Sequence, residues 1–220
     1  METKKVTLNE VKMQFLLADK FREYFEKVPE ESIIDDICRL TEEYDKMLRS
    51  YEKLSEIEIN KLFIDKTRLT RYDSLDWNKG EIELARMGPW PEMKGLDIRY
   101  TTGNVPDTVE RVKKVWKDRT IYNQPKIPRG FYDKINSIKS NFYFVYPRFP
   151  IILTPGGTER AFHNEWVRNG GEGLIKQGQE NDWLCQIYDY DVDSGNARAF
   201  SYASLNIDRI NCYFGRRKIE

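Results

Sequence analysis

The chain has 220 residues, and its 36 basic side chains balance 36 acidic ones, so the formal net charge is zero. This balance excludes a protein that wraps a polyanion through a strong overall field. A content of 11 Phe, 13 Tyr and 5 Trp favours a packed, folded chain despite a mean hydropathy of −0.71.

Amphipathic helices are expected in the N-terminal third. Apolar residues at 3,4 spacing predict a helix over 8–28, which Pro29 ends. Ser55 and Glu58 match the S-x-x-E capping box, which predicts a short helix to about Lys66. Between them, a helix with an unbroken heptad ridge is expected. The ridge consists of Ile33, Ile37, Leu40, Tyr44, Met47, Tyr51 and Leu54.

These patterns predict two units. Residues 1–66 are expected to form an antiparallel helical hairpin or arm, and residues 67–220 an aromatic-rich α+β domain. We expect the heptad ridge to bind a protein partner or a second copy of the chain. The alternative is that the ridge packs against the rest of the same chain.

The middle of the chain, 67–135, has an irregular pattern. Residues 87–95 are bracketed by prolines, so a structured loop is expected there. One helix is predicted from Asp107, whose side chain would be the N-cap with Glu110 three residues later.

Beyond residue 140 the pattern favours strands. Aromatic residues over 141–146 and the apolar run 151–153 predict two strands, and 209–214 predicts another. Segments 183–192 and 197–205 flank a turn-like sequence at 193–196, which predicts a hairpin. The expected fold class is therefore α+β, with an N-terminal helical hairpin, an irregular region with one helix, and a C-terminal, mostly antiparallel sheet.

Few residues point to catalysis. His163 is the single histidine, which excludes mechanisms and metal sites that need a histidine pair. It could act as a lone general base oriented by Glu165, or it could be structural. Neither glycine cluster, at 154–158 or 169–173, continues into a nucleotide-binding fingerprint.

Asp189, Asp191 and Asp193 are spaced so that one strand would place them on one face. Asp189 and Asp191 are the remaining catalytic candidates, and all three carboxylates could hold Mg²⁺. They do not fit a calcium loop, because Gly195 comes one residue late and Phe200 replaces the bidentate Glu. In the alternative, Asp191 is neutralised across the hairpin by Arg198. No cofactor is expected, with Mg²⁺ as the alternative.

Basic residues alternate with aromatic ones over 107–139. Such a pattern can follow a phosphate backbone and stack bases, although any solvated helix also carries cations. The tail 215–218 adds cations if it folds back nearby. The candidate nucleic-acid-binding residues are Arg111, Lys113, Lys114, Trp116, Lys117, Arg119 and Arg129.

The location expected is cytoplasmic, because Cys38, Cys185 and Cys212 form neither an even set nor a C-x-x-C pair. No leader-like segment or run of about 18 apolar residues occurs, so no membrane insertion is expected. The sequence favours a non-enzymatic assembly or adaptor protein that uses the helical hairpin for protein contact. The alternative is a nucleic-acid-binding protein or a Mg²⁺-dependent nuclease that uses the basic segment and the aspartates.

Overall fold

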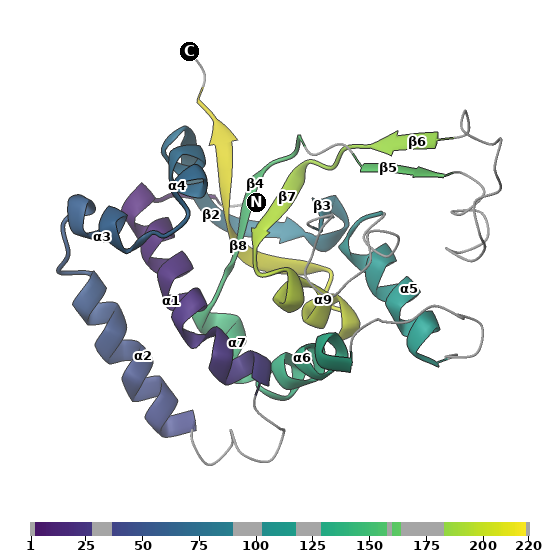
Figure 1. The fold of residues 1–220 in the computed structure, drawn as a ribbon, viewed down its shortest axis with the longest axis horizontal. Helices are drawn as coiled ribbons and strands as arrows, with labels where there is room; N and C mark the ends of the chain where they lie inside the picture. Colours follow the sequence, from purple (N-terminus) through teal and green to yellow (C-terminus); the bar gives the residue numbers. More distant parts are fainter. Residues whose placement is uncertain are drawn as a thin grey trace.

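A computed structural model describes residues 3–27, 37–89, 103–117, 129–157, 160–163 and 183–218. Together these residues form an α+β fold (Figure 1). The helices are α1 (Leu8–Lys27), α2 (Ile37–Tyr51), α3 (Glu56–Leu62), α4 (Lys66–Asp73), the 3₁₀ helix η1 (Leu84–Arg86), α5 (Val105–Lys117), α6 (Arg129–Ser140), α7 (Phe142–Arg148) and α9 (Asn196–Ser204). The strands are β1 (Lys4–Lys5), β2 (Leu75–Glu83), β3 (Met87–Gly88), β4 (Ile151–Pro155), β5 (Arg160–His163), β6 (Trp183–Gln186), β7 (Tyr190–Ser194) and β8 (Arg209–Arg217).

The main sheet is mixed and draws strands from both halves of the chain. Its order is β1-β2-β8-β4-β7-β3. The pairs β4–β8 and β3–β7 are parallel, and the other pairs are antiparallel. The expected C-terminal, mostly antiparallel sheet therefore differs from the fold, because β1, β2 and β3 precede residue 90 and the central pair β4–β8 is parallel.

Alternation along the central strands explains why both faces of the sheet are covered. On β8, Ile210, Cys212 and Phe214 belong to one core cluster, whereas Tyr213 belongs to a second. On β4, Ile152 joins the second cluster while its neighbours join the first. Successive side chains of a strand point to opposite faces, so strands apolar on both faces need cover on both.

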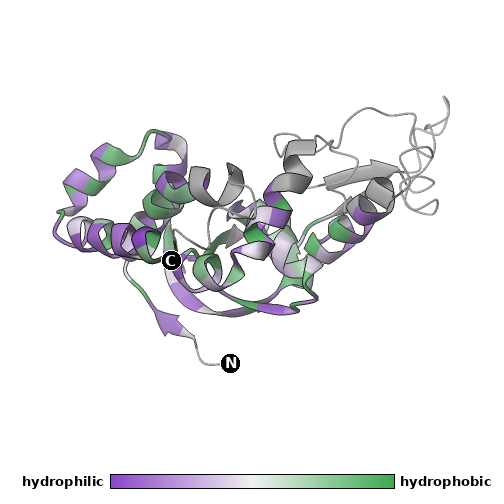
Figure 2. Cartoon of the chain, turned by 90° about the horizontal axis from the view of Figure 1, so that it is seen from below, coloured by the Kyte–Doolittle hydropathy of each residue, from purple (hydrophilic) through white to green (hydrophobic). Residues whose placement is uncertain are grey.

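Helix α1 belongs to the body of the molecule. Leu17 and Phe21 lie in the first core cluster, and Val11 lies in the second. Helix α1 contacts α2, and it also contacts α6 and β2 (Figure 1). The segment between α1 and α2 lies outside the described residues, so the expected hairpin is not confirmed. Figure 2 shows hydrophilic and hydrophobic residues mixed along the helices that it colours.

Local signals placed several elements correctly. Helix α1 matches the expected 8–28 closely, and the Ser55–Glu58 capping box forms at the start of α3. Strands β4 and β8 confirm the predictions at 151–153 and 209–214. The N-cap of α5, in contrast, is Asn104, whose side chain accepts the Asp107 N–H at 2.9 Å. Asp107 itself lies inside the helix.

Two predicted strands are helices. Residues 142–148 form α7, in which Phe142 and Tyr146, four residues apart, stack at 4.8 Å between ring centroids. Residues 196–204 form the buried helix α9, which begins after Gly195 at φ 101°. Because these residues form a helix, the expected hairpin at 193–196 is wrong. Alanine at 197, 199 and 203 favours the helix. The expectation of an irregular region with one helix over 67–135 is also wrong in part, because α4, β2 and the start of α6 lie there in addition to α5.

Lys12 ties α1 to the two short helices that follow α2. Its side chain is fully buried, and its Nζ lies 2.8 Å from Asp73 Oδ1 and 2.9 Å from Asn60 Oδ1. A carboxylate oxygen of Glu56 lies 3.6 Å away. A buried ammonium is stable only when it is paired in this way.

We predict that Lys12→Ala lowers the free energy of unfolding by about 2–3 kcal/mol, because it removes the partner of Asp73 and leaves a cavity. Urea denaturation monitored by circular dichroism measures the change. The matched control is Lys20→Ala, an exposed position on the same helix, where a change within about 0.5 kcal/mol is expected. Equal losses in the two variants would contradict the proposed role of Lys12.

Candidate functional site

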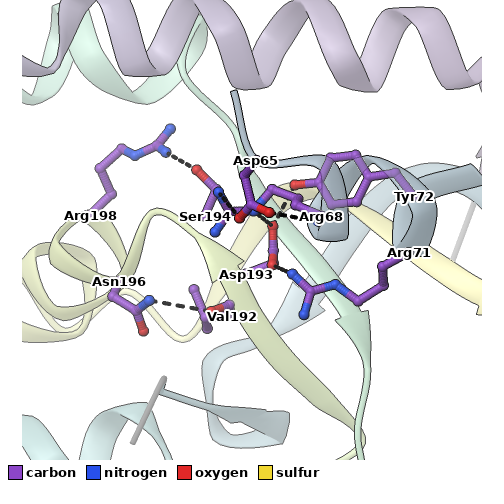
Figure 3. Close-up of polar contacts among 9 residues, drawn as sticks. All are labelled: Asp65, Arg68, Arg71, Tyr72, Val192, Asp193, Ser194, Asn196 and Arg198. Atoms are coloured by element: carbon purple, nitrogen blue, oxygen red, sulfur yellow. Dashed lines mark hydrogen bonds and ion pairs between the residues drawn. The ribbon is translucent and has the colours of Figure 1, made fainter. Parts of the chain in front are cut away.

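An ion-pair network joins α4 to β7 around Asp193. The Asp193 carboxylate accepts hydrogen bonds from Arg68 Nε at 2.9 Å, from Arg71 Nη2, and from the Tyr72 hydroxyl at 2.5 Å (Figure 3). Its side chain is 1% exposed. Two guanidinium groups and one hydroxyl therefore compensate a carboxylate that has been removed from water.

The sequence of α4 places these donors on one side of the helix. Asp65 caps the helix, with its Oδ1 accepting the Arg68 N–H at 2.9 Å. Arg68 and Arg71 are three residues apart, so they lie on the same helix face. Arg68 also stacks over the Phe15 ring at 4.7 Å, which fixes its direction.

Tyr72 is held neutral by its position. Burial raises the pKa of its hydroxyl well above the usual value, and the adjacent negative charge of Asp193 raises it further. A neutral hydroxyl can donate to Asp193, whereas a phenolate would repel it. Tyr72 therefore acts as a structural donor in the network.

We predict that Asp193→Asn lowers the free energy of unfolding by about 2–3 kcal/mol, because Arg71 loses its buried counter-charge and Arg68 keeps only Asp65, at 3.4 Å. The matched control is Asp189→Asn. Asp189 pairs with Arg86 at 2.6 Å, but both side chains are exposed, so a loss of at most about 1 kcal/mol is expected. Chemical denaturation of both variants measures the difference, and equal losses would show that the Asp193 network contributes no more than a surface pair.

Beside this network lies a half-open cleft of about 410 Å³. Its walls come from the end of α4 and the start of β2, the ends of β4 and β8, and the start of β7. The lining residues are Arg71, Ser74, Leu75, Thr154, Pro155, Gly157, Asp191 and Arg217. Because β4 and β8 are parallel, their carboxyl ends meet at this edge of the sheet.

Two glycines shape the loop that follows β4. A Cβ at Gly156 would lie 1.6 Å from the Tyr188 carbonyl oxygen, so no other residue fits there. At Gly157, the nearest atom to a Cβ would be Arg217 Nη2 at 3.7 Å, an ordinary contact. The Gly157 N–H donates to Asp191 Oδ2 at 3.3 Å. A side chain at Gly157 would therefore enter the cleft without backbone strain.

The two guanidinium groups of the cleft differ in their partners. Arg71 is bound to Asp193, yet its Nε is buried and has no hydrogen-bond partner within the described residues. Arg217 is exposed and forms no ion pair with any acidic side chain that the structure describes. A guanidinium without a counter-ion at a cleft wall is suited to an oxyanion.

The three aspartates do not form one ligand set. Asp191 and Asp193 alternate on β7 as expected and lie on the side of α4, but Asp193 is occupied by arginines. Asp189 precedes the strand and pairs with Arg86. Within the described parts of the chain, no three His, Cys, Asp or Glu side chains gather closely enough to hold a metal ion.

The expected pairing of Asp191 with Arg198 across a hairpin is wrong. Arg198 lies in α9 and is buried, and its Nη1 donates to the carbonyl oxygens of Phe149 and, at 3.1 Å, Pro150. It also contacts Ser194 Oγ at 3.4 Å (Figure 3). The structure shows arginines of α4 neutralising another β7 aspartate, Asp193.

The heptad ridge lies largely against the chain's own core. Leu40 is 2% exposed and Tyr44 is 6% exposed. The Tyr44 hydroxyl donates to the Arg148 carbonyl oxygen at 3.0 Å, and its ring packs edge-on against Phe149. The partly buried ridge residues packed against the two core clusters are Ile37, Met47, Tyr51 and Leu54. Ile33 lies outside the described residues.

The remaining sequence candidates are only partly described. His163 ends β5 opposite Trp183 of β6, in a two-stranded ribbon that extends away from the main sheet (Figure 1). Glu165 and Arg119 lie outside the described residues. For the nucleic-acid candidates on α5 and α6, the structure describes the backbone, but it describes the side chain only of Lys113, which pairs with Glu110 at 2.8 Å. The candidates with a described backbone alone are Arg111, Lys114, Trp116, Lys117 and Arg129.

The C-terminal cations lie beside α4. Lys218 Nζ donates to the Asp73 carbonyl oxygen at 2.8 Å, and Arg217 lines the cleft. The sequence indicated that the tail 215–218, which includes Arg217, would add cations to segment 107–139 if it folded back nearby, and no expectation from the sequence singled out Arg71. A local signal existed only for α4, where the arginine spacing and the Asp65 cap define one basic face.

Two cysteines contrast in reactivity. Cys212 is buried, and burial raises the pKa of its thiol, so it remains protonated near neutral pH. Cys38 is exposed on α2. We predict that iodoacetamide alkylates Cys38 in the folded protein and leaves Cys212 unmodified, as measured by mass spectrometry of peptides. Denatured protein, in which both thiols react, is the control, and equal labelling of both in the folded protein would contradict the burial of Cys212.

No protein-family model, curated protein or solved structure matches this chain. Among the described residues, no helix combines the length and apolar character that crossing a lipid bilayer requires. The cleft and its charges are therefore the observations from which a function is inferred.

Proposed function

We propose that this chain binds a small molecule that carries an oxyanion, a phosphate or a carboxylate, in the cleft between α4 and the sheet. The observation that supports this proposal is Arg217. Its guanidinium lines the cleft and has no acidic partner among the described residues. Guanidinium groups bind phosphate and carboxylate through paired N–H donors, which is the chemistry that this wall offers.

Further polar groups surround Arg217. The buried Arg71 Nε lacks an acceptor among the described residues, and a buried donor without an acceptor is costly. The hydroxyl of Ser74 already donates to the Arg71 carbonyl oxygen at 2.8 Å, so it can accept from a ligand. A ligand oxyanion near Arg217 and Arg71 would add charge-assisted hydrogen bonds.

The size of the cleft favours a small molecule. Its volume of about 410 Å³ falls in the range of roughly 300–1,000 Å³ that is typical of small-molecule sites. Contact with a protein partner through the heptad ridge has less support, because Leu40 and Tyr44 are covered by the chain itself. Nucleic-acid binding through segment 107–139 stays an alternative proposal that rests on composition.

The proposal is tested by isothermal titration calorimetry with inorganic phosphate and with ethyl phosphate, at matched ionic strength. We predict measurable binding that Arg217→Ala weakens by about 10–100-fold, because a charge-assisted hydrogen bond contributes about 1.5–3 kcal/mol. Gly157→Leu should also weaken binding, since its side chain would occupy the cleft.

The matched control is Arg216→Ala, which removes the same charge from the neighbouring position of β8. Arg216 stacks over Phe214 and does not line the cleft, so its loss should leave phosphate affinity nearly unchanged. Equal effects of the two substitutions would indicate nonspecific attraction and overturn the proposal. Binding of a short single-stranded oligonucleotide, with no binding of either phosphate, would favour the nucleic-acid alternative instead.

A further inference from the structure

The cleft has apolar groups beside its cations, and these groups restrict the ligand beyond the need for an oxyanion. Leu75 of β2 and Arg217 of β8 stand directly opposite each other in the antiparallel pair. Residues in such a pair project from the same face of the sheet, with their Cβ atoms roughly 5 Å apart. Both residues line the cleft. An oxyanion that binds Arg217 would therefore carry its substituent close to a leucine.

Leu75 forms a wall that is held in place. Its side chain lies over Gly215, where a Cβ would be 2.6 Å from Leu75 Cδ1. Gly215 precedes Arg217 by two residues on β8, so the two positions share one face of the sheet. Leu75 is 8% exposed and belongs to the second core cluster. The part of its side chain that faces the cleft is thus fixed next to the guanidinium.

The β4 side of the cleft offers an even surface. Pro155, Gly156 and Gly157 follow one another at the end of β4, and the first and last of them line the cleft. None of the three projects a flexible side chain, and the carbonyl oxygen of Tyr188 leaves no room for one at Gly156. A planar ring makes many close contacts on such a surface, and these contacts are collectively favourable.

An inorganic oxyanion would leave these apolar groups unused. The cleft of about 410 Å³ exceeds the space that a phosphate group fills. Small-molecule sites bury most of their ligand's surface, mainly against apolar groups, and use a few polar groups for orientation. Apolar ligand surface contributes to binding in proportion to the area that is removed from water. A ligand with a planar apolar group next to its oxyanion would use both kinds of wall.

We propose that the ligand is an aryl oxyanion: a phosphate or carboxylate binds Arg217, and the aromatic ring that carries it packs against Leu75 and Pro155. This inference rests on the proposed oxyanion-binding function and narrows its ligand class to aromatic phosphates and aromatic acids. Leu75 and Pro155 then select the ligand, while Arg217 supplies the attraction for its charge.

The test compares phenyl phosphate with ethyl phosphate, two monoesters with the same phosphate group. Both are dianions at pH 8, because the second pKa of a phosphate monoester is about 6. Calorimetry on the full chain should show that phenyl phosphate binds about 10-fold more tightly, since its ring buries more apolar surface. Arg217→Ala should weaken both probes by a similar factor. Phenol, which lacks the phosphate, should show no measurable binding.

Two substitutions remove apolar surface from the cleft. Leu75→Ala and Pro155→Ala should each lower the preference for phenyl phosphate to about 3-fold or less and change the affinity for ethyl phosphate little. Leu205→Ala is the matched control, because Leu205 is exposed and does not line the cleft, so this variant should keep the full preference. The preference is a ratio within one variant, so a smaller folded fraction affects both probes equally. Pro155 is less buried than Leu75, and Pro155→Ala decides the test if thermal unfolding shows that Leu75→Ala does not fold.

The outcomes separate this inference from the function on which it depends. Equal affinities for the two probes, or tighter binding of ethyl phosphate, would overturn the aryl ligand and leave oxyanion binding intact. Absence of binding by both probes would overturn both proposals. A preference that stays undiminished in the folded variants, or phenol binding as tight as that of phenyl phosphate, would assign the ring to another surface and also overturn the inference.

Discussion

The buried carboxylate of Asp193 determines where α4 sits, and much of the molecule depends on that placement. Arg68, Arg71 and Tyr72 all point to this one acceptor. Because an unpaired carboxylate in the interior is very unfavourable, α4 has one position on β7 that satisfies it. That position also sets one wall of the cleft, since Arg71 contributes to both. The proposed ligand recognition and the docking of α4 therefore share a side chain.

The sequence predicted the elements whose signals are local. The Ser55–Glu58 capping box needs four residues and formed as expected. The strand predictions for 142–148 and 196–204 failed for different reasons. Aromatic residues favour strands, but Phe142 and Tyr146 stack along a helix face, so tertiary packing outweighed intrinsic preference. The turn-like residues at 193–196 favoured a hairpin, whereas the alanines that follow them favour the helix that forms over 196–204. On strand β2 the apolar residues change phase, with Leu75 and Trp77 in one core cluster and Ile82 in the other, so no regular alternation along the whole strand marks it in the sequence.

The candidate site was harder to anticipate, because its members are distant in sequence. Arg71 and Asp193 are 122 residues apart, and no local pattern links them. The aspartate spacing on β7 correctly placed Asp191 and Asp193 on one face, but it could not show that arginines of α4 already occupied one of them. Single charged residues such as Arg217 resemble any surface cation in a sequence. They can be recognised as members of one site only when the fold brings them to the same edge of the sheet.

The position of β8 has a consequence for how the chain matures during synthesis. This strand is the last in the described chain, yet it lies between β2 and β4 at the middle of the sheet. A ribosome must therefore release nearly all of residues 1–217 before the two halves of the sheet can join. Until then, the edges of β2 and β4 that β8 later covers stay unpaired, and unpaired strand edges can hydrogen-bond to other chains.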